Sequence, residues 1–225
     1  MLRAQSLFLV LSLISQCFAW TALIPVSNSS SYMFLKQLKV FPNAVTVCDR
    51  DTTYPHCDIS LDRNYKYRTL PAKTMDMFKK AIEVLPDEDV FLKFDDDVIA
   101  DYQYVLKVVK DIEESGRMYF GDPMACVRKG WKHSGARCMN GKFYGVSRPI
   151  AECFANLVEE SNIRTILEDI FFGSTVWAKC KYLGFQYKAS KESLIWHKKY
   201  ENRNKCANLS FKGDHQTCMA MSGIH

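Results

Sequence analysis

The chain has 225 residues, of which 48% are hydrophobic and 24% charged, and its formal net charge is +5 at pH 7. These values are ordinary for a globular domain and exclude disordered and collagen-like chains. The positive charge is spread thinly over the length, so we expect no nucleic-acid partner. We find no internal repeat or long linker, which predicts a single domain.

The first residues have the pattern of a secretory leader. Arg3 precedes an apolar run over residues 7–14, and Cys17-Phe18-Ala19 fits the small-x-small rule for signal peptidase. We therefore predict a signal peptide over residues 1–19 and a mature domain over residues 20–225. The alternative is a short uncleaved signal anchor reaching to Ile24, and membrane association is expected only if the leader is retained.

Cysteine usage agrees with an oxidising compartment. Removing the leader removes Cys17 and leaves eight of the nine cysteines, an even number that suits disulfide formation in the secretory pathway. Their pairing is left open by the sequence. No C-x-x-C spacing occurs, which argues against a zinc or thioredoxin-type site. Two sequons, at Asn28 and Asn208, are consistent with secretion.

Helical and strand patterns alternate from residue 71 onward. Apolar residues at helical spacing predict helices over 71–85, 102–115, 148–160 and 168–182. Asp101 and Ser147 are the expected N-caps of the second and third helices, and Gly116 and Gly184 the expected stops of the second and fourth. Short apolar runs predict strands over 89–94 and 118–120. This alternation predicts an α/β fold with a mostly parallel sheet.

Three carboxylates follow the first of these strands directly. Ligands of open α/β sheets bind at the carboxyl ends of strands, and Asp95, Asp96 and Asp97 would repel one another there without a cation or solvent. Alternate positions point the same way, so Asp95 and Asp97 suit a hard divalent metal that also grips a diphosphate. The plain alternative is an acidic, solvated loop.

Two further candidates lie later in the chain. Glu168 and Asp169 occupy the first turn of a predicted helix, where the helix dipole favours their ionised forms, and ordinary helix-start chemistry is enough to explain them. His197 is either a metal ligand or a packed histidine. The G-x-S-x-G, H-E-x-x-H and G-x-G-x-x-G motifs are absent, and the glycines before Lys142 fit a P-loop poorly.

Four short blocks over roughly residues 58–200 resemble, in order, the motifs of the β-1,3-galactosyltransferase-like family, glycosyltransferase family 31. The blocks are Tyr67-Arg68-x-Leu70-x-x-Lys73-Thr74, Phe91-Leu92-Lys93-x-Asp95-Asp96-Asp97-Val98, Cys138-x-x-Gly141-x-x-Tyr144-x-x-Ser147 and Leu167-Glu168-Asp169-Ile170-x-x-Gly173. Each block alone is weak. Their common order makes the resemblance specific.

The resemblance implies a single GT-A-type domain that transfers galactose or N-acetylhexosamine, with inversion, from a UDP-sugar to a glycan or glycoprotein hydroxyl. It implies Mn²⁺ or Mg²⁺ as cofactor and a lumenal location in the Golgi or ER, either secreted or anchored in the Golgi membrane. By their place in the motifs, the implied residues are Asp169 as general base; Asp95 and Asp97 at the metal; Arg68, Lys73, Lys93 and Asp96 at the donor; and Gly141, Tyr144 and Glu168 at the acceptor. The resemblance also implies a C-terminal metal ligand, and His197, outside the four motifs, is the candidate for it.

The chain departs from the family pattern in two places. The stretch between the leader and Tyr67 is short, so we expect the first βα unit of the domain to be shortened or missing. Ser134-Gly135-Ala136-Arg137 stands where the family has Y-P-x-Y, a difference expected to affect acceptor recognition.

Two other classes of function stay open at the level of sequence. One is a catalytically inactive lumenal homologue that binds a glycan or a partner through the same cleft. The other is a disulfide-stapled secreted protein whose acidic cluster binds Ca²⁺ structurally, although no EF-hand loop is present.

Overall fold

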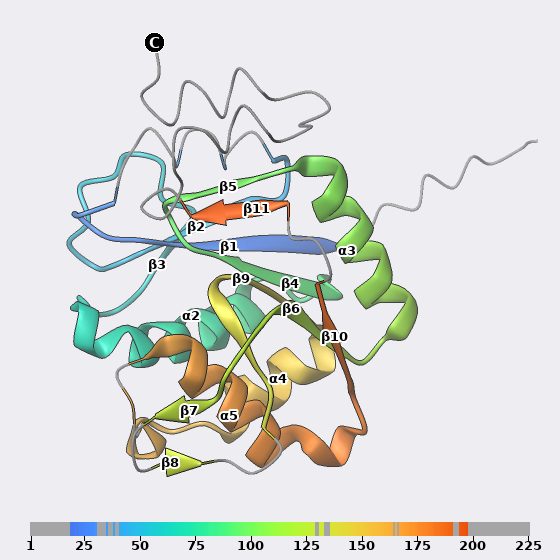
Figure 1. Ribbon diagram of the computed structural model, residues 1–225. Helices are drawn as coiled ribbons and strands as arrows, with labels where there is room; N and C mark the ends of the chain where they lie inside the picture. Colours follow the sequence, from blue (N-terminus) through green and yellow to red (C-terminus); the bar gives the residue numbers. More distant parts are fainter. Residues whose placement is uncertain are drawn as a thin grey trace, which may run out of the picture.

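A seven-stranded sheet with helices on both faces forms the centre of the protein (Figure 1). The computed structural model describes residues 19–30, 35, 38, 41–128, 131–132, 136–163, 165, 167–190 and 194–197. The strand order is β10-β6-β9-β4-β1-β2-β3, and all neighbouring pairs are parallel except the two that β9 makes. This mixed, mostly parallel sheet confirms the predicted fold class.

The N-terminal part of the chain supplies a central strand. β1 (Trp20–Val26) lies between β4 and β2 (Ala44–Cys48), and the short β3 (Ile59–Ser60) follows at the edge. All of β1 except Pro25 is buried. Residues 20–24 form a sheet strand and not part of an anchor, which corrects the alternative of an anchor reaching to Ile24. The strand of the first βα unit is also present, so this unit is not missing as a whole. Residues 1–18 lie outside the described part of the chain.

The middle of the chain agrees closely with its sequence pattern. After η1 (Tyr67–Thr69) come α2 (Leu70–Val84), β4 (Val90–Phe94), β5 (Val98–Ala100) and α3 (Tyr102–Ser115). The Asp101 carboxylate caps α3 by accepting a 2.8 Å hydrogen bond from Tyr104 N. Gly116 ends the helix with φ of 63°, a left-handed conformation that favours glycine. Both predicted ends of this helix are confirmed.

The next strands include three that the sequence did not predict, β7, β8 and β9. β6 (Met118–Met124) runs beyond its predicted end, and β7 (Val127–Arg128) and β8 (Trp131–Lys132) form a separate small sheet. β9 (Cys138–Ser147) then enters the main sheet antiparallel, between β4 and β6. Because of its reversed direction, its first residues lie at the same edge as the last residues of β4.

The last helices lie where the pattern predicts, with earlier ends. α4 (Arg148–Leu157) stops three residues before the predicted boundary and is followed by η2 (Glu160–Asn162). α5 (Glu168–Cys180) gives way to η3 (Lys181–Leu183), which Gly184 closes, and β10 (Gln186–Ala189) and β11 (Ile195–His197) follow. Ser147 is the N-cap of α4, but its hydroxyl accepts from Met118 N at 3.1 Å and makes no capping hydrogen bond.

Two apolar cores lie on opposite faces of the sheet. Helices α2, α4 and α5 pack on one face, where Phe172 contacts the rings of Tyr144 and Phe154 with centroids 4.5 Å apart. Helix α3 packs on the other, through Val105, Val108, Val109 and Ile112. This arrangement fixes the start of α5, and with it Glu168 and Asp169, against the sheet.

Three disulfides brace the domain: Cys48–Cys57, Cys126–Cys138 and Cys153–Cys180, the last joining α4 to α5. They fit a secretory or lumenal protein, as the cysteine count predicts. Cys206, Cys218 and the sequon at Asn208 lie outside the described residues. Among the residues described, we find no helix long and apolar enough to cross a membrane.

Candidate active site

The candidate residues gather at one edge of the sheet. Strands β1, β2 and β4 are parallel, so their carboxyl ends share this edge, and the antiparallel β9 begins there. Asp95 N, just past β4, donates a 3.0 Å hydrogen bond to the carbonyl of Lys142 in β9. Carboxyl ends of strands are where α/β sheets bind ligands. The turn after β4 and the start of β9 therefore form one local structure.

The turn over residues 95–97 concentrates negative charge. All three aspartates are half-buried. Burial raises the pKa of Asp96, and the carboxylates of Asp95 and Asp97 raise it further, while a hydrogen bond from Ser30 and the charge of Lys73 oppose the shift. A cation bound at this turn would relieve the repulsion.

The third predicted metal ligand is near this turn in backbone register. β11 pairs antiparallel with β5, and His197 lies opposite Val98, the residue after Asp97. The side chain of His197 is not among those described, and the described residues contain no group of three His, Cys, Asp or Glu side chains able to hold a metal. One or two carboxylates with substrate phosphates are nevertheless a usual ligand set for Mg²⁺. The oxygen donors of the turn therefore fit a hard divalent ion.

Lys93 connects the acidic turn to the start of α5. Its side chain is only 3% exposed, and Nζ lies 2.5 Å from Oδ1 of Asp95 and 3.3 Å from Oε2 of Glu168. It also donates to the carbonyl of Gly141 at 2.5 Å. Burial alone would lower the pKa of Lys93, but the two carboxylates outweigh it and raise that pKa. The lysine thus stays charged and holds the two acidic motifs together.

Glu168 is the more enclosed carboxylate of its pair. Its side chain is 9% exposed, and Oε1 accepts a 2.5 Å hydrogen bond from the hydroxyl of Tyr144. Burial raises the pKa of Glu168, with Lys93 and Tyr144 opposing. Because Lys93 and Tyr144 fix both of its oxygens, Glu168 orients the start of α5.

Asp169 lies beside Glu168 and faces β9. Its Oδ1 accepts a 2.8 Å hydrogen bond from Ile170 N. A Cβ atom placed on Gly141 would lie 3.1 Å from Oε2 of Glu168 and 3.5 Å from Oδ2 of Asp169. Because the glycine of the third motif has no side chain, both carboxylates can lie directly against β9.

The glycine of the fourth motif has a similar role deeper in the fold. A Cβ atom on Gly173 would lie 2.8 Å from Sγ and 2.9 Å from Cα of Cys138, and 3.0 Å from the carbonyl oxygen of Arg137. Helix α5 therefore approaches the start of β9 closely, at the cysteine that the third motif contributes. The two motifs pack against each other at both glycines.

Gly173→Ala is expected to destabilise the protein by about 1–3 kcal/mol, the usual cost of overpacking, because two of the three obstructing atoms belong to the backbone. Thermal unfolding of the purified variant measures this. Ala178→Gly, a change in the same helix, is the comparison for helix propensity and is expected to cost about 1 kcal/mol or less. A Gly173→Ala variant as stable as the parent would contradict the close approach.

Lys73, one of the predicted donor residues, has partners within the protein. Its buried Nζ lies 2.8 Å from Oδ1 of Asp49 and donates to the carbonyl of Val26 at 2.8 Å, so it joins the ends of β1 and β2. Burial lowers the pKa of Lys73, and Asp49 opposes this. Arg68, by contrast, lies exposed in η1. Donor binding by Arg68, Lys73, Lys93 and Asp96 stays a prediction.

Sequence reasoning missed Asp49 and Ser30, which lie at the same edge. Asp49 follows the apolar strand β2 directly, as Asp95 follows β4, and it pairs with Lys73. An acidic residue at the end of a buried strand was the available signal. Ser30 carries no comparable signal, since its link to Asp96 depends on the path of the chain after β1.

Comparison with known proteins gives a family match over part of the chain. Residues 46–134 match the family model described as Galactosyltransferase, a range that contains the first two of the four motifs. This match supports a galactosyltransferase-like family. No curated protein was found to match.

Two solved structures share similarity with the chain at low identity. The crystal structure of A197 from STIV is 19% identical, with 70% of this chain and 78% of that chain covered and a TM-score of 0.44. A glycosyltransferase involved in the glycosylation of the major capsid of PBCV-1 is 12% identical, with 83% of this chain and 96% of that chain covered and a TM-score of 0.48.

Proposed function

Taking this chain as galactosyltransferase-like, we propose that it is an inverting hexosyltransferase that moves galactose or N-acetylhexosamine from a UDP-sugar to a hydroxyl of a glycan or glycoprotein. Glycosyl transfer in general follows from the family match over residues 46–134. The donor, the metal and the base are the proposed parts.

The observation that carries the proposal is the joining of two acidic motifs by one buried lysine. Lys93 contacts Asp95 and Glu168 together, although they are far apart in the sequence. A transferase of this kind needs negative charge to hold a metal diphosphate and a second carboxylate nearby to accept a proton. Lys93 brings these two groups to one edge of the sheet.

In this proposal, Asp169 takes the proton from the acceptor hydroxyl as that oxygen attacks the anomeric carbon from the face opposite the leaving UDP. Glu168 is held by Lys93 and Tyr144, so it keeps the first turn of α5 in place. Gly141, which has no side chain, lets the Glu168 and Asp169 carboxylates lie directly against β9. The new glycosidic bond forms as the bond between the anomeric carbon and the diphosphate breaks, and UDP leaves. The configuration of the anomeric carbon is inverted.

Asp95 and Asp97, with His197 as a further ligand, are the residues proposed to hold Mn²⁺ or Mg²⁺. A divalent ion there supplies Lewis-acid neutralisation of the departing diphosphate. In this proposal Asp96 and Lys73 bind the donor, and Ser30 and Asp49 position them.

UDP release tests the proposed reaction directly. Purified protein is incubated with UDP-galactose, UDP-N-acetylglucosamine and UDP-N-acetylgalactosamine, with a panel of glycan acceptors, in Mn²⁺ or in chelator. We expect acceptor-dependent UDP release from at least one donor, lost in chelator. Glycan binding without release from any donor would support an inactive homologue.

Asp97→Ala is expected to raise the Mn²⁺ concentration needed for half-maximal UDP release by at least about tenfold, because a carboxylate ligand is lost. Direct Mn²⁺ titration by electron paramagnetic resonance is expected to show the same shift without turnover. Asp87→Ala, at the turn before β4, is the matched control and should leave the titration unchanged. An unchanged titration for Asp97→Ala would remove it from the metal site.

A further inference from the structure

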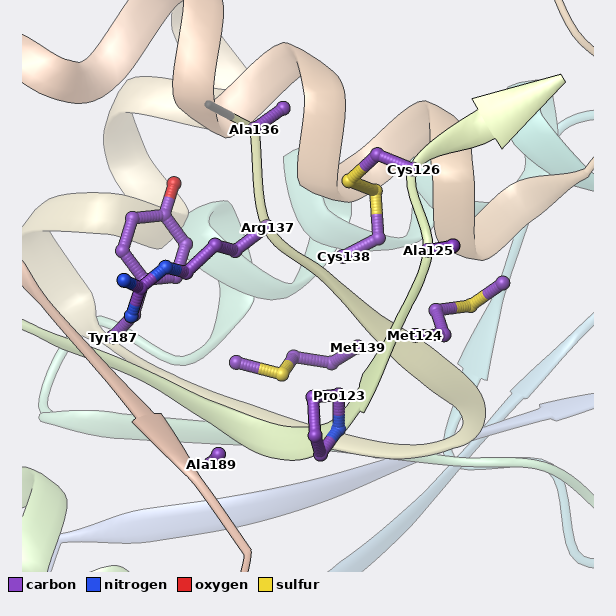
Figure 2. A pocket seen from close by; sticks show the side chains of 10 residues that line it. All are labelled: Pro123, Met124, Ala125, Cys126, Ala136, Arg137, Cys138, Met139, Tyr187 and Ala189. Atoms are coloured by element: carbon purple, nitrogen blue, oxygen red, sulfur yellow. A yellow bond between two sulfur atoms is a disulfide. The ribbon is translucent and has the colours of Figure 1, made fainter. Parts of the chain in front are cut away.

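A half-open cavity of about 440 Å³ lies near the candidate active site. Figure 2 shows the side chains that line it. It is formed where β6 and β10 end and β9 begins, so it shares the edge of the sheet that carries Asp95 and Asp169. Its lining is apolar apart from one cation and one phenol: Pro123, Met124, Ala125, Cys126, Ala136, Arg137, Cys138, Met139, Tyr187 and Ala189. A volume of this size is sufficient for a small ring system.

The cavity walls are fixed by covalent and close contacts. The disulfide between Cys126 and Cys138 ties the segment after β6 to the start of β9. The pairing of β6 with β9 shifts register between Gly121 and Pro123 and then continues at Pro123 and Met124, so the paired strands themselves form one wall of the cavity. Gly173 packs directly on Cys138. The cavity is therefore preformed, which lowers the entropic cost of binding.

Tyr187 provides an aromatic wall of the cavity, with one cation beside it. Its ring packs against Phe185, Tyr119 and Trp177 at centroid distances of 4.8, 5.6 and 6.1 Å. The exposed guanidinium of Arg137 lies 5.7 Å from the ring centroid, as the crossing side chains in Figure 2 show. The Tyr187 hydroxyl is buried, so the accessible polar group of this wall is the Arg137 guanidinium.

Strand β9 runs from the cavity to the proposed base, Asp169. Met139 lines the cavity, and Gly141, two residues further, lies against Asp169. Two residues of extended strand span about 7 Å, roughly one sugar ring. A sugar whose hydroxyl reaches Asp169 would therefore direct its substituent toward the cavity.

We propose that this cavity binds an aromatic aglycone attached to the acceptor sugar, with the ring against Ala189 and the Tyr187 ring and the linking oxygen near Arg137. This inference rests on the proposed glycosyl transfer and adds the acceptor class. Acceptors with an aryl group are preferred over those with a methyl group on the same sugar.

The test compares phenyl and methyl β-glycosides of galactose, N-acetylglucosamine and N-acetylgalactosamine as acceptors. Burial of an aromatic ring predicts at least about a tenfold higher kcat/KM for the phenyl compound of the accepted sugar. Ala189→Trp fills the cavity and should bring the ratio close to one, with the methyl acceptor nearly unchanged. Lys188→Trp is the matched control, because Lys188 faces Asp111 on the other side of β10 and should keep the ratio.

Saturation-transfer NMR with the phenyl glycosides and no donor separates this inference from the proposed reaction. We expect transfer to the phenyl protons in the parent protein and in Lys188→Trp, a weaker signal in Arg137→Ala, and loss in Ala189→Trp. If this pattern is seen but no donor gives UDP release, the aglycone-binding cavity is supported and the proposed glycosyl transfer is rejected. Equal phenyl signals, or equal acceptor ratios, in Ala189→Trp and Lys188→Trp would overturn the aglycone site.

Discussion

Asp169→Asn is expected to lower kcat by about 10²- to 10⁴-fold while leaving the fold and donor binding intact, because the amide cannot accept the proton that a positioned carboxylate takes. The substitution is nearly isosteric, and the amide oxygen can still accept the 2.8 Å hydrogen bond from Ile170 N. Steady-state UDP release and thermal unfolding are measured on the same preparation, with donor binding followed by calorimetry.

The matched control for this variant is Asp101→Asn. Asp101 is also an acid at the start of a helix, and asparagine caps a helix about as well as aspartate. If Asp169 served only the helix dipole, both variants would lose at most about 1 kcal/mol of stability and little activity. A destabilised Asp169→Asn protein with near-normal kcat would therefore reject the base assignment.

Lys93→Met is expected to reduce the free energy of unfolding by about 3–5 kcal/mol, because it leaves the buried carboxylate of Glu168 and the half-buried one of Asp95 without their cation. For a domain of this size that corresponds to a fall in Tm of roughly 6–20 °C. Methionine has a similar length, so the loss reports charge more than volume. Chemical denaturation with a fixed m-value gives the change directly.

Two further variants make this result specific. Lys93→Met with Glu168→Gln removes the charge on both sides of the 3.3 Å pair and is expected to recover part of the loss. Lys188→Met breaks an ion pair of 2.8 Å with Asp111, but that lysine is 45% exposed, so the cost should stay below about 1 kcal/mol. Similar losses for Lys93→Met and Lys188→Met would argue against the connecting role of Lys93.

The elements that the sequence predicts best are those with one uninterrupted apolar period. Helix α3 has Val105, Val108, Val109 and Ile112 on one face between a capping aspartate and a left-handed glycine, so both ends are readable. Strand β9 was missed because Asn140, Gly141 and Lys142 interrupt its apolar pattern. Strand β1 was missed because its apolar run continues that of the predicted leader. The first strand of a domain and an anchor have the same composition.

In the candidate site, too, the sequence predicts the individual motifs but not the contacts between them. The acidic turn and the Glu168–Asp169 pair were found because each follows or begins a recognisable element. Their connection through Lys93 was not found, since it depends on β9 entering the sheet beside β4. Lys73 was assigned to the donor from its motif, whereas its partner Asp49 becomes visible only when β1 and β2 lie side by side.

The reversed strand β9 also determines how the domain can assemble. In the main sheet, β6 and β10 join β4, β1, β2 and β3 only through β9, which pairs with β4 on one side and β6 on the other. The sheet thus has two parts, β6 with β10 and β4 with β1, β2 and β3, which β9 joins. Because β6 precedes β9 in the chain, β6 cannot be connected to the four-stranded part until β9 is in place. Late, long-range pairing of this kind is slow. The two parts of the sheet therefore fold together only when β9 pairs with both of them. The same strand carries Gly141 and Tyr144 of the candidate site.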